Sequence, residues 1–295
     1  MKLNRIVLAG ALSVAAIPLT LGATATATPA VPACIVSLSP SATDTLFAIG
    51  AGPQVQAVDQ DSNYPAAAAA LAKKDHLNAL APSFESLLGI CKGGTKPNLV
   101  ILSYNPSDLQ QKLQAQGVTV LEQNAPTTVA GAVNQIRQLG QVTGHSQAAV
   151  GIAAAMNQSI STAIASVPAH KGRTVSVYYE VSTNPYYSLT SSTFVGSVMK
   201  AMGLTNIADA AATSADAGYP SLSTEYIISA NPSIIFLAGD ATVASVAKRS
   251  GFANVAAVKN GNVVELNANE ASQWGPEFTK LVVAITAEVT KALKK

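Results

Sequence analysis

Short β-branched runs alternate with alanine-rich helical stretches along most of this 295-residue chain. Brief apolar runs separated by helical segments are typical of parallel strands in an α/β fold. In the first part of the chain we expect strands at 35–38, 55–58, 99–102 and 118–121, with helices from Ser41 or Thr43 to Ile49 and from Ser107 to Gln116. This set predicts one Rossmann-like lobe over residues 34–126.

The alternation stops between Thr127 and Val167, where no strand is predicted. Residues 146–167 place apolar side chains three or four positions apart, which predicts one helix with a single apolar face. A helix of about 22 residues is roughly 33 Å long, enough to cross a domain boundary. Within the helical segment 127–167 we therefore expect residues 146–167 to be an interdomain helix.

A second set of strands and helices follows, from which we predict a C-terminal lobe over residues 172–295. Its expected strands are 174–178, 233–237 and 263–266, and its expected helices are 192–202, 243–250 and 276–295. The predicted fold class is thus α/β, with two Rossmann-like lobes joined by a single long interdomain helix and a ligand cleft between the lobes.

The first 28 residues predict a secretory signal peptide. Met1 to Arg5 is positively charged, Ile6 to Gly22 is apolar, and Ala23 to Ala27 offers small-residue cleavage sites. This order is the pattern of an export signal. A retained membrane anchor is the alternative, because the apolar run is only slightly shorter than a membrane span of about 20 residues. We expect an exported protein, in the periplasm or at the cell surface.

The charge balance argues against a polyanionic partner. Loss of Lys2 and Arg5 with the signal peptide leaves 16 of the 18 basic residues, equal to the 16 acidic residues. Binding of nucleic acid or an anionic membrane requires a clustered basic surface. We expect a monomer that does not bind nucleic acid.

Two cysteines, Cys34 and Cys91, remain after the signal peptide. Export permits a disulfide, and in a sheet whose first and third strands are neighbours both cysteines would lie near one sheet edge. A lipid on Cys34 is the alternative, since residues 31–34 faintly resemble a lipobox. Pro32 fits that pattern poorly, so the disulfide is favoured.

Candidate ligand contacts follow the predicted strands, because ligands of open α/β sheets bind beyond the carboxyl ends of the strands. Many of the residues at these places are aromatic, with broad apolar faces suited to a large, partly apolar ligand. Each tyrosine could instead simply cap the core. The candidates are Ser39, Pro40, Ser41, Tyr64, Tyr104, Tyr179, Tyr186, Tyr187, Asp240 and Trp274.

No enzymatic motif is recognisable. The sequence has no G-x-S-x-G elbow, H-E-x-x-H helix or Walker loop, and Ser39 has no evident histidine base. A zinc or manganese site needs three or four convergent ligands, which the sequence does not predict. His76 could supply one axial contact to a metal already held in a macrocycle, or it could be a solvated loop residue. We expect no catalytic residues, no cofactor and no metal site of the protein's own.

Four segments, spread over nearly the whole exported chain, match one family pattern. They are Ile35–Asp44 with Phe47–Gly50, Asp59–Pro65, Pro82–Glu85 leading to Pro97–Val100, and Gly218–Glu225 leading to Asn231–Ile235. These segments resemble the cobalamin, haem and iron-siderophore group of ABC-transporter substrate-binding proteins.

The resemblance implies two lobes joined by a rigid helix, and docking to the importer's membrane subunits through one acidic residue on each lobe. Glu85 and Glu225 are at the matching positions. Asn184–Tyr187 and Tyr219–Pro220 look most like the cobalamin-binding branch, where aromatics contact the corrin. Tyr219 thereby joins the candidate ligand contacts.

Two departures from the family pattern bear on the ligand. Residues 78–80 lack a tryptophan often seen in the cobalamin branch, which weakens the corrinoid interpretation. The second-lobe cleft lacks an arginine cluster typical of receptors for anionic siderophores. A haem or ferric-siderophore receptor and an enzyme or scaffold on the same two-lobed frame therefore stay open as alternatives to a corrinoid receptor.

Overall fold

The computed structural model describes residues 31–294, and the predicted signal peptide at 1–28 lies outside these residues. The first of two parallel four-stranded sheets has the strand order β2-β1-β3-β4. Its strands are β1 (Ile35–Leu38), β2 (Val55–Val58), β3 (Leu99–Leu102) and β4 (Thr119–Glu122). The first and third strands are neighbours, as expected, with Ile35 opposite Leu99.

The second parallel sheet has the strand order β10-β9-β5-β7. Its strands are β5 (Ser176–Glu180), β7 (Thr205–Asn206), β9 (Ile234–Leu237) and β10 (Val263–Glu265). A short antiparallel pair, β6 (Tyr186–Tyr187) and β8 (Ser221–Leu222), lies apart from this sheet. The strands β1, β3 and β9 are buried at every position, as expected for central strands covered on both faces.

Most predicted elements are present, with shifted ends. α1 (Pro40–Ala48) is capped by Ser39 rather than by Ser41 or Thr43, because Pro40 occupies its first position and the Ser39 hydroxyl accepts the Ala42 N–H. α4 (Leu109–Ala115) begins two residues later than predicted, since the backbones of Ser107 and Asp108 have positive φ angles and cannot continue a helix.

Several elements were not predicted from the sequence. Ala66 to Ala70 begins α2, and short helices occupy parts of both halves of the chain.

The remaining helices, predicted and unpredicted together, have the following bounds: α2 (Ala66–Asp75), α3 (Phe84–Leu88), α7 (Phe194–Ala201), α8 (Thr224–Ala230), α9 (Val243–Ala247), α10 (Ala256–Lys259), α11 (Ala268–Ala271) and α12 (Phe278–Leu293).

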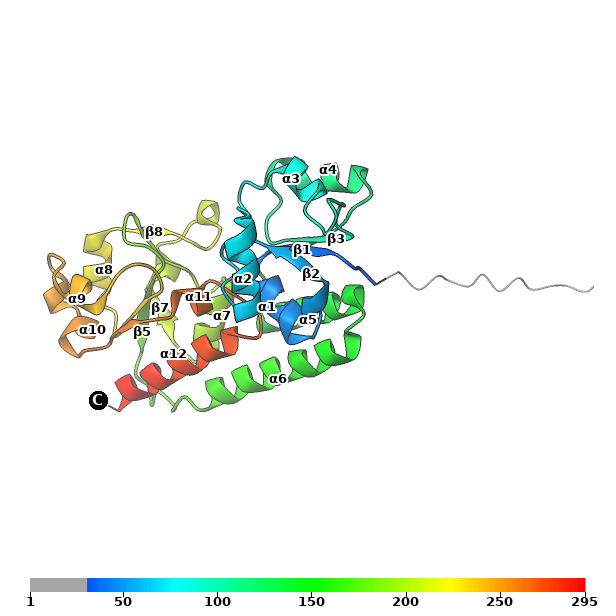
Figure 1. Cartoon of the computed structure of the whole chain (residues 1–295). Helices are drawn as coiled ribbons and strands as arrows, with labels where there is room; N and C mark the ends of the chain where they lie inside the picture. The colour runs from blue at the N-terminus through cyan, green and yellow to red at the C-terminus, as the bar shows by residue number, and fades with distance from the viewer. Residues whose placement is uncertain (1–30, 295) are drawn as a thin grey trace, which may run out of the picture. The chain divides into compact units, whose positions relative to one another are not determined.

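Two antiparallel helices form the stretch between the sheets: α5 (Val129–Thr143) and α6 (Ser146–Ala165). α6 buries one stripe of side chains that includes Ala153, Met156 and Ile160. It packs against α5 and α12, which lies alongside it (Figure 1). Among the described residues, α6 is the one helix long and apolar enough to cross a membrane, and 28% of its apolar window is buried within the fold. The predicted domain boundaries at 126, 167 and 172 stay predictions.

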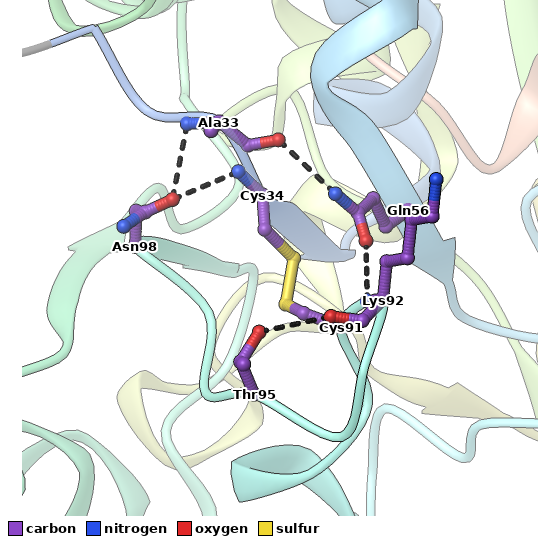
Figure 2. The surroundings of a disulfide bond; sticks show 7 residues. All are labelled: Ala33, Cys34, Gln56, Cys91, Lys92, Thr95 and Asn98. Carbon is purple, nitrogen blue, oxygen red and sulfur yellow. Dashed lines mark hydrogen bonds between the residues drawn. A yellow bond between two sulfur atoms is a disulfide. The ribbon is translucent and has the colours of Figure 1, made fainter.

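A disulfide joins Cys34 and Cys91, whose Cα atoms are 6.2 Å apart. Asn98 accepts the backbone N–H of Cys34 at 2.9 Å, and Gln56 accepts the backbone N–H of Lys92 at 2.8 Å, so both ends are held by side chains of the same sheet region (Figure 2). The predicted disulfide is therefore present. A sulfur in a disulfide cannot also carry a lipid thioether, which argues against lipidation of Cys34.

We predict opposite effects from two glycine-to-alanine changes in the α5–α6 pair. A Cβ on Gly140 would lie 2.2 Å from the Ala149 Cβ, whereas a Cβ on the exposed Gly151 would meet nothing within 4 Å. Gly140→Ala should lower the free energy of unfolding by about 1–3 kcal/mol through overpacking. Gly151→Ala should raise it by about 0.5–1 kcal/mol, because alanine restricts the unfolded chain. Urea denaturation measures both, and a neutral Gly140→Ala would contradict the close approach of the helices.

Candidate ligand-binding site

The polar side chains of the loop between β1 and α1 make hydrogen bonds within the protein. Ser39 is fully buried as the helix cap, and Pro40 follows it at the first helical position. The Ser41 hydroxyl accepts a hydrogen bond from the backbone N–H of Trp274 at 3.0 Å. Ser39 and Ser41 thus use their hydroxyls in contacts within the protein, and the predicted contact of these three residues with a ligand stays a prediction.

A buried chain of polar groups supports the loop after β2. The Asp59 carboxyl lies 2.7 Å from the Ser62 hydroxyl, which lies 2.9 Å from the Thr43 hydroxyl. Thr43 in turn lies 2.9 Å from the Ser37 hydroxyl, which donates to the Ser39 carbonyl at 3.2 Å. The chain has four contacts, but three hydroxyls supply only three hydrogens. A protonated Asp59 supplies the fourth, so that every contact is a hydrogen bond.

Burial raises the pKa of Asp59 to about 6, against the opposing hydrogen bonds from Ser62 and Asp61. The folded protein therefore holds the Asp59 proton more tightly than a free side chain does, and the carboxyl is neutral at pH values below about 6. This arrangement fixes the loop that carries Tyr64 at the edge of the first sheet.

The other candidate residues of the first half are more exposed. Tyr64 is 43% exposed, and the Lys280 ammonium lies 5.0 Å from the centre of its ring. Tyr104 is 56% exposed beyond β3. His76 is an exposed left-handed residue that ends α2. Tyr64 follows β2 and Tyr104 follows β3, the two parallel strands on either side of β1, so each presents aromatic surface beyond the carboxyl end of a strand.

In the second half, two adjacent tyrosines of β5 point to opposite faces of the sheet. Tyr178 packs in the cluster with Ile207 and Phe252, and Tyr179 packs in the cluster with Phe194. This is the alternation that a strand imposes on successive side chains. Both side chains are fully buried, and burial raises the pKa of each.

An ion pair that was not predicted from the sequence lies beside these tyrosines. Arg249 donates to both oxygens of the buried Glu180 carboxylate, at 2.6 and 2.7 Å. The Arg249 guanidinium lies 4.9 Å from the centre of the Tyr186 ring. Glu180 therefore has its charge satisfied within the protein, and the pair fixes Tyr186, whose neighbour Tyr187 is 42% exposed. Its partners are 69 residues apart, so no local pattern could reveal it.

A cavity of about 200 Å³ lies at the carboxyl ends of β5 and β9 in the second sheet. It brings together three of the candidate residues, Tyr179, Tyr219 and Trp274. Its other lining residues are small or apolar apart from one serine: Ala125, Val181, Leu189, Phe194, Val195, Ala238, Ala268, Ala271 and Ser272. Asp240 is not among the lining residues; it is exposed and accepts a hydrogen bond from Thr183 at 3.0 Å.

The segment with Trp274 contacts elements of the first half of the chain. The Trp274 ring N–H donates to Gln135 of α5 at 2.8 Å, and the Glu277 backbone N–H donates to Asp44 of α1 at 2.9 Å. Gly275 is required between them, since a Cβ there would lie 2.6 Å from an Asp44 oxygen. Burial, opposed by the Glu277 hydrogen bond, raises the pKa of Asp44 to about 7. The cavity therefore lies beside a direct contact between the two halves, and Ala125 of the first half lines it.

No group of three or more metal-binding side chains comes together within residues 31–294. The polar groups around the cavity are instead hydroxyl, indole and backbone groups, which suit hydrogen bonding to an organic ligand.

The sequence matches the family model described as periplasmic binding protein over residues 35–270. The chain belongs to this family. A cobalamin-binding protein of Halobacterium salinarum is 29% identical over 259 residues, which cover 84% of this chain and 67% of that protein. The resemblance inferred from the four sequence segments is thus confirmed.

Two solved structures share the fold. The periplasmic vitamin B12 binding protein BtuF of Vibrio cholerae has a TM-score of 0.72 at 24% identity, covering 90% of this chain and 99% of that chain. The periplasmic haem-binding protein RhuT from Roseiflexus sp. RS-1, in its apo form, has a TM-score of 0.73 at 22% identity, covering 88% and 98%. The predicted two-lobed α/β class is confirmed by this similarity.

The raised pKa of Asp59 predicts a pH-dependent stability. The pKa is about 6 in the folded protein against 3.8 for a free side chain, so the folded state holds the proton more tightly. The stabilising contribution is then complete below about pH 4 and is lost as the pH rises through about 6, by at most about 3 kcal/mol. The pKa of Asp44 is also raised, to about 7, so its stabilising contribution is likewise lost as the pH rises, but at a higher pH.

Asp59→Asn tests this prediction, because an amide can donate to Ser62 as the protonated acid does. Between pH 4 and pH 7 the free energy of unfolding should fall less steeply in this variant than in the parent protein, as measured by urea denaturation at a series of pH values. Parallel profiles for the two proteins would show that Asp59 is ionised in the fold.

Proposed function

We propose that this protein is an exported substrate-binding protein of an ABC importer that binds a corrinoid such as cobalamin. The observation that carries the proposal is the aromatic surface at the carboxyl ends of the strands. Tyr64, Tyr104, Tyr187 and Tyr219 are each between 42% and 56% exposed there. Large aromatic surfaces are seldom left in water without a ligand or partner, and tyrosine binds broad, partly apolar molecules well.

The chemistry of the second half supports a neutral or weakly charged ligand. Arg249, whose guanidinium lies beside the Tyr186 ring, is paired with Glu180 and is unavailable to a ligand carboxylate. A haem with two propionates or an anionic siderophore would gain less from such a site than a corrinoid, whose periphery is amide-rich. The name of the Halobacterium relative, a cobalamin-binding protein, points the same way.

We infer a capture mechanism without turnover. The two halves are held together by packed helices and by hydrogen bonds from the segment that carries Trp274, so the site is largely formed before a ligand arrives. Such preorganisation reduces the entropy lost on binding. Delivery then requires a surface that the importer recognises, for which Glu85 and Glu225 are the candidates.

The local structures of these two acids match. Each is exposed in the first turn of a short helix and follows a serine cap: Ser83 for Glu85 in α3, and Ser223 for Glu225 in α8. Neither has an ion-pair partner among the described residues. Two unpaired acids in equivalent positions, one in each half, are suited to steering and docking to basic groups.

A ligand panel tests the proposed specificity. The purified protein is incubated with cyanocobalamin, haemin or a ferric siderophore, desalted and examined by absorption spectroscopy. We expect retention of cyanocobalamin alone. Tyr187→Ala with Tyr219→Ala should weaken cyanocobalamin binding by about tenfold or more, a loss of roughly 1.4 kcal/mol. Val283→Ala, which shortens an exposed apolar side chain of α12, is the control. Retention of haemin or siderophore instead would replace the corrinoid proposal, and hydrolytic or redox turnover without retention would favour an enzyme.

Charge reversal tests the docking role. Glu85→Lys with Glu225→Lys should abolish cobalamin uptake by cells that carry the importer, while the affinity for cyanocobalamin measured by calorimetry stays within about twofold of the parent. Glu288→Lys, which reverses a partly exposed acid of α12 that pairs with Lys291, should leave uptake intact. Lost affinity in the double variant, or normal uptake, would refute a separate docking function for these acids.

A further inference from the structure

Residues 274–277 bring the second half of the chain onto α1 of the first half. The Trp274 backbone N–H donates to the Ser41 hydroxyl at 3.0 Å, and the Glu277 backbone N–H donates to an oxygen of the Asp44 carboxyl at 2.9 Å. Between these bonds, Gly275 lies so close to α1 that a Cβ on it would be 2.6 Å from the same oxygen. Asp44 is 2% exposed. Its carboxyl would regain contact with water if this segment moved away from α1.

The Asp44 carboxyl has no ion-pair partner among the described residues. Burial raises its pKa to about 7, and the hydrogen bond from the Glu277 backbone opposes this rise. The Glu277 carboxylate raises the pKa further, while Lys280 lowers it. Lys280 is itself paired with Glu277, so the cation that acts on Asp44 is shared with another acid. A negative charge on Asp44 is therefore poorly compensated.

Of the charged groups around α1, only Glu277 and Lys280 shift the pKa of Asp44. The neighbouring strands β1 and β2 and residues 52–54 have no ionisable side chain. Asp59 contacts α1 through the Ser62 and Thr43 hydroxyls. The other neighbours of α1 are α2 and α5 with the turn after it, whose ionisable residues are Lys73, Lys74, Asp75, Arg137 and His145. The charge state of Asp44 thus depends on its burial and on the segment that covers it.

We propose that Asp44 is a positioning residue for Trp274 and acts as a pH-sensitive latch: when its carboxyl loses its proton to water, residues 274–277 part from α1 far more often. The inference rests on the proposed function, because it takes the cavity wall formed by Trp274 as part of the ligand site. A buried carboxylate without its own cation is unfavourable, and parting of the segment restores its hydration. Only the residues before α12 need to move, so the apolar core stays packed.

The direction of the pH dependence follows from the raised pKa. It is about 7 while the contact is made, against 3.8 for a free side chain. The contact is therefore most stable below about pH 4, weakens by up to about tenfold per pH unit as the pH rises, and changes no further above about pH 7. Ligand that needs the Trp274 wall is held best where the contact is most stable.

Hydrogen exchange at Trp274 tests the latch. Trp274 is the one tryptophan of the chain, so its ring N–H gives a single indole signal in a nuclear magnetic resonance spectrum. The exchange rate, corrected for the intrinsic rate at each pH, measures how often the ring leaves Gln135. Protection should fall at least about 30-fold between pH 4 and pH 7 and then level off, and the Glu277 backbone N–H should follow it. The amides of β1 report global unfolding and should stay more protected. A flat profile for Trp274 would overturn the latch.

Two matched variants assign the effect to one carboxyl. In Asp44→Asn the amide oxygen still accepts the Glu277 N–H but the side chain cannot ionise, so the protection of Trp274 should no longer depend on pH. Asp59→Asn removes the other buried acid with a raised pKa and should retain the fall. Circular dichroism and thermal melting check that both variants fold. A fall that persists in Asp44→Asn would assign it to another group and reject the proposal.

Two neighbouring variants leave Asp44 in place and move its pKa in opposite directions. Glu277→Gln removes a carboxylate but keeps the backbone N–H, so the profile should level off roughly half a pH unit lower. Lys280→Met removes the cation, so the profile should level off higher by a similar amount. A purely structural contact between residues 274–277 and α1 would show neither shift, and the absence of both would contradict the latch.

Cyanocobalamin separates this inference from the proposed function. At a concentration of about a hundred times its dissociation constant, it should raise the protection of the Trp274 ring N–H at least about tenfold at pH 7. If it binds without changing this protection, or if the profile without ligand is flat, the latch is rejected and the corrinoid function stands. If it does not bind but the profile and the variants behave as expected, the latch stands and the corrinoid function is rejected.

Discussion

The structure depends on one apolar core that both sheets share. Side chains of β1 and β3 in the first sheet, and of β5 and β9 in the second, belong to a single buried cluster that runs through α5, α6 and α12. The rings of Phe194 and Phe278, tilted by 41° with centroids 4.3 Å apart, lie within it. Separating the halves would expose this core to water, at a cost proportional to the apolar area uncovered. Large opening movements are therefore opposed by the same packing that stabilises the fold.

The polar contacts between the halves lie where this core ends. Trp274 donates from its backbone to Ser41 and from its ring to Gln135, while Glu277 donates to the buried Asp44 carboxyl. The connection between the two sheets is therefore broader than the one helix expected from the sequence, because the chain returns to α1 just before α12. Hydrogen bonds are directional, so these contacts fix the position of the Trp274 ring, which forms part of the cavity wall.

The sequence predicted those parts of the fold that local patterns determine. β1 and β3 are short, mostly apolar runs whose ends the structure reproduces, and the apolar spacing of α6 follows the face it buries. Local patterns failed where the backbone conformation, or a partner far away in the sequence, determines the structure. The left-handed Ser107 delayed α4, and five alanines at the start of α2 offer no periodicity to recognise. The partnership of Glu180 with Arg249 depends on how the chain folds back, which spacing cannot show.

In the candidate site, too, local patterns predicted some features and could not predict others. Placing tyrosines at the carboxyl ends of strands needed only the strand assignments, and Tyr179, Tyr219 and Trp274 do line one cavity. The sequence could not distinguish Tyr179 from Tyr178, because either residue could face the cavity until the strand register is known. With β5 at 176–180 instead of 174–178, the pairing of Tyr179 with Phe236 sets which face each ring occupies. A shift of one residue in that register would exchange the two tyrosines, so the polarity of the cavity depends on the backbone pairing of a single strand.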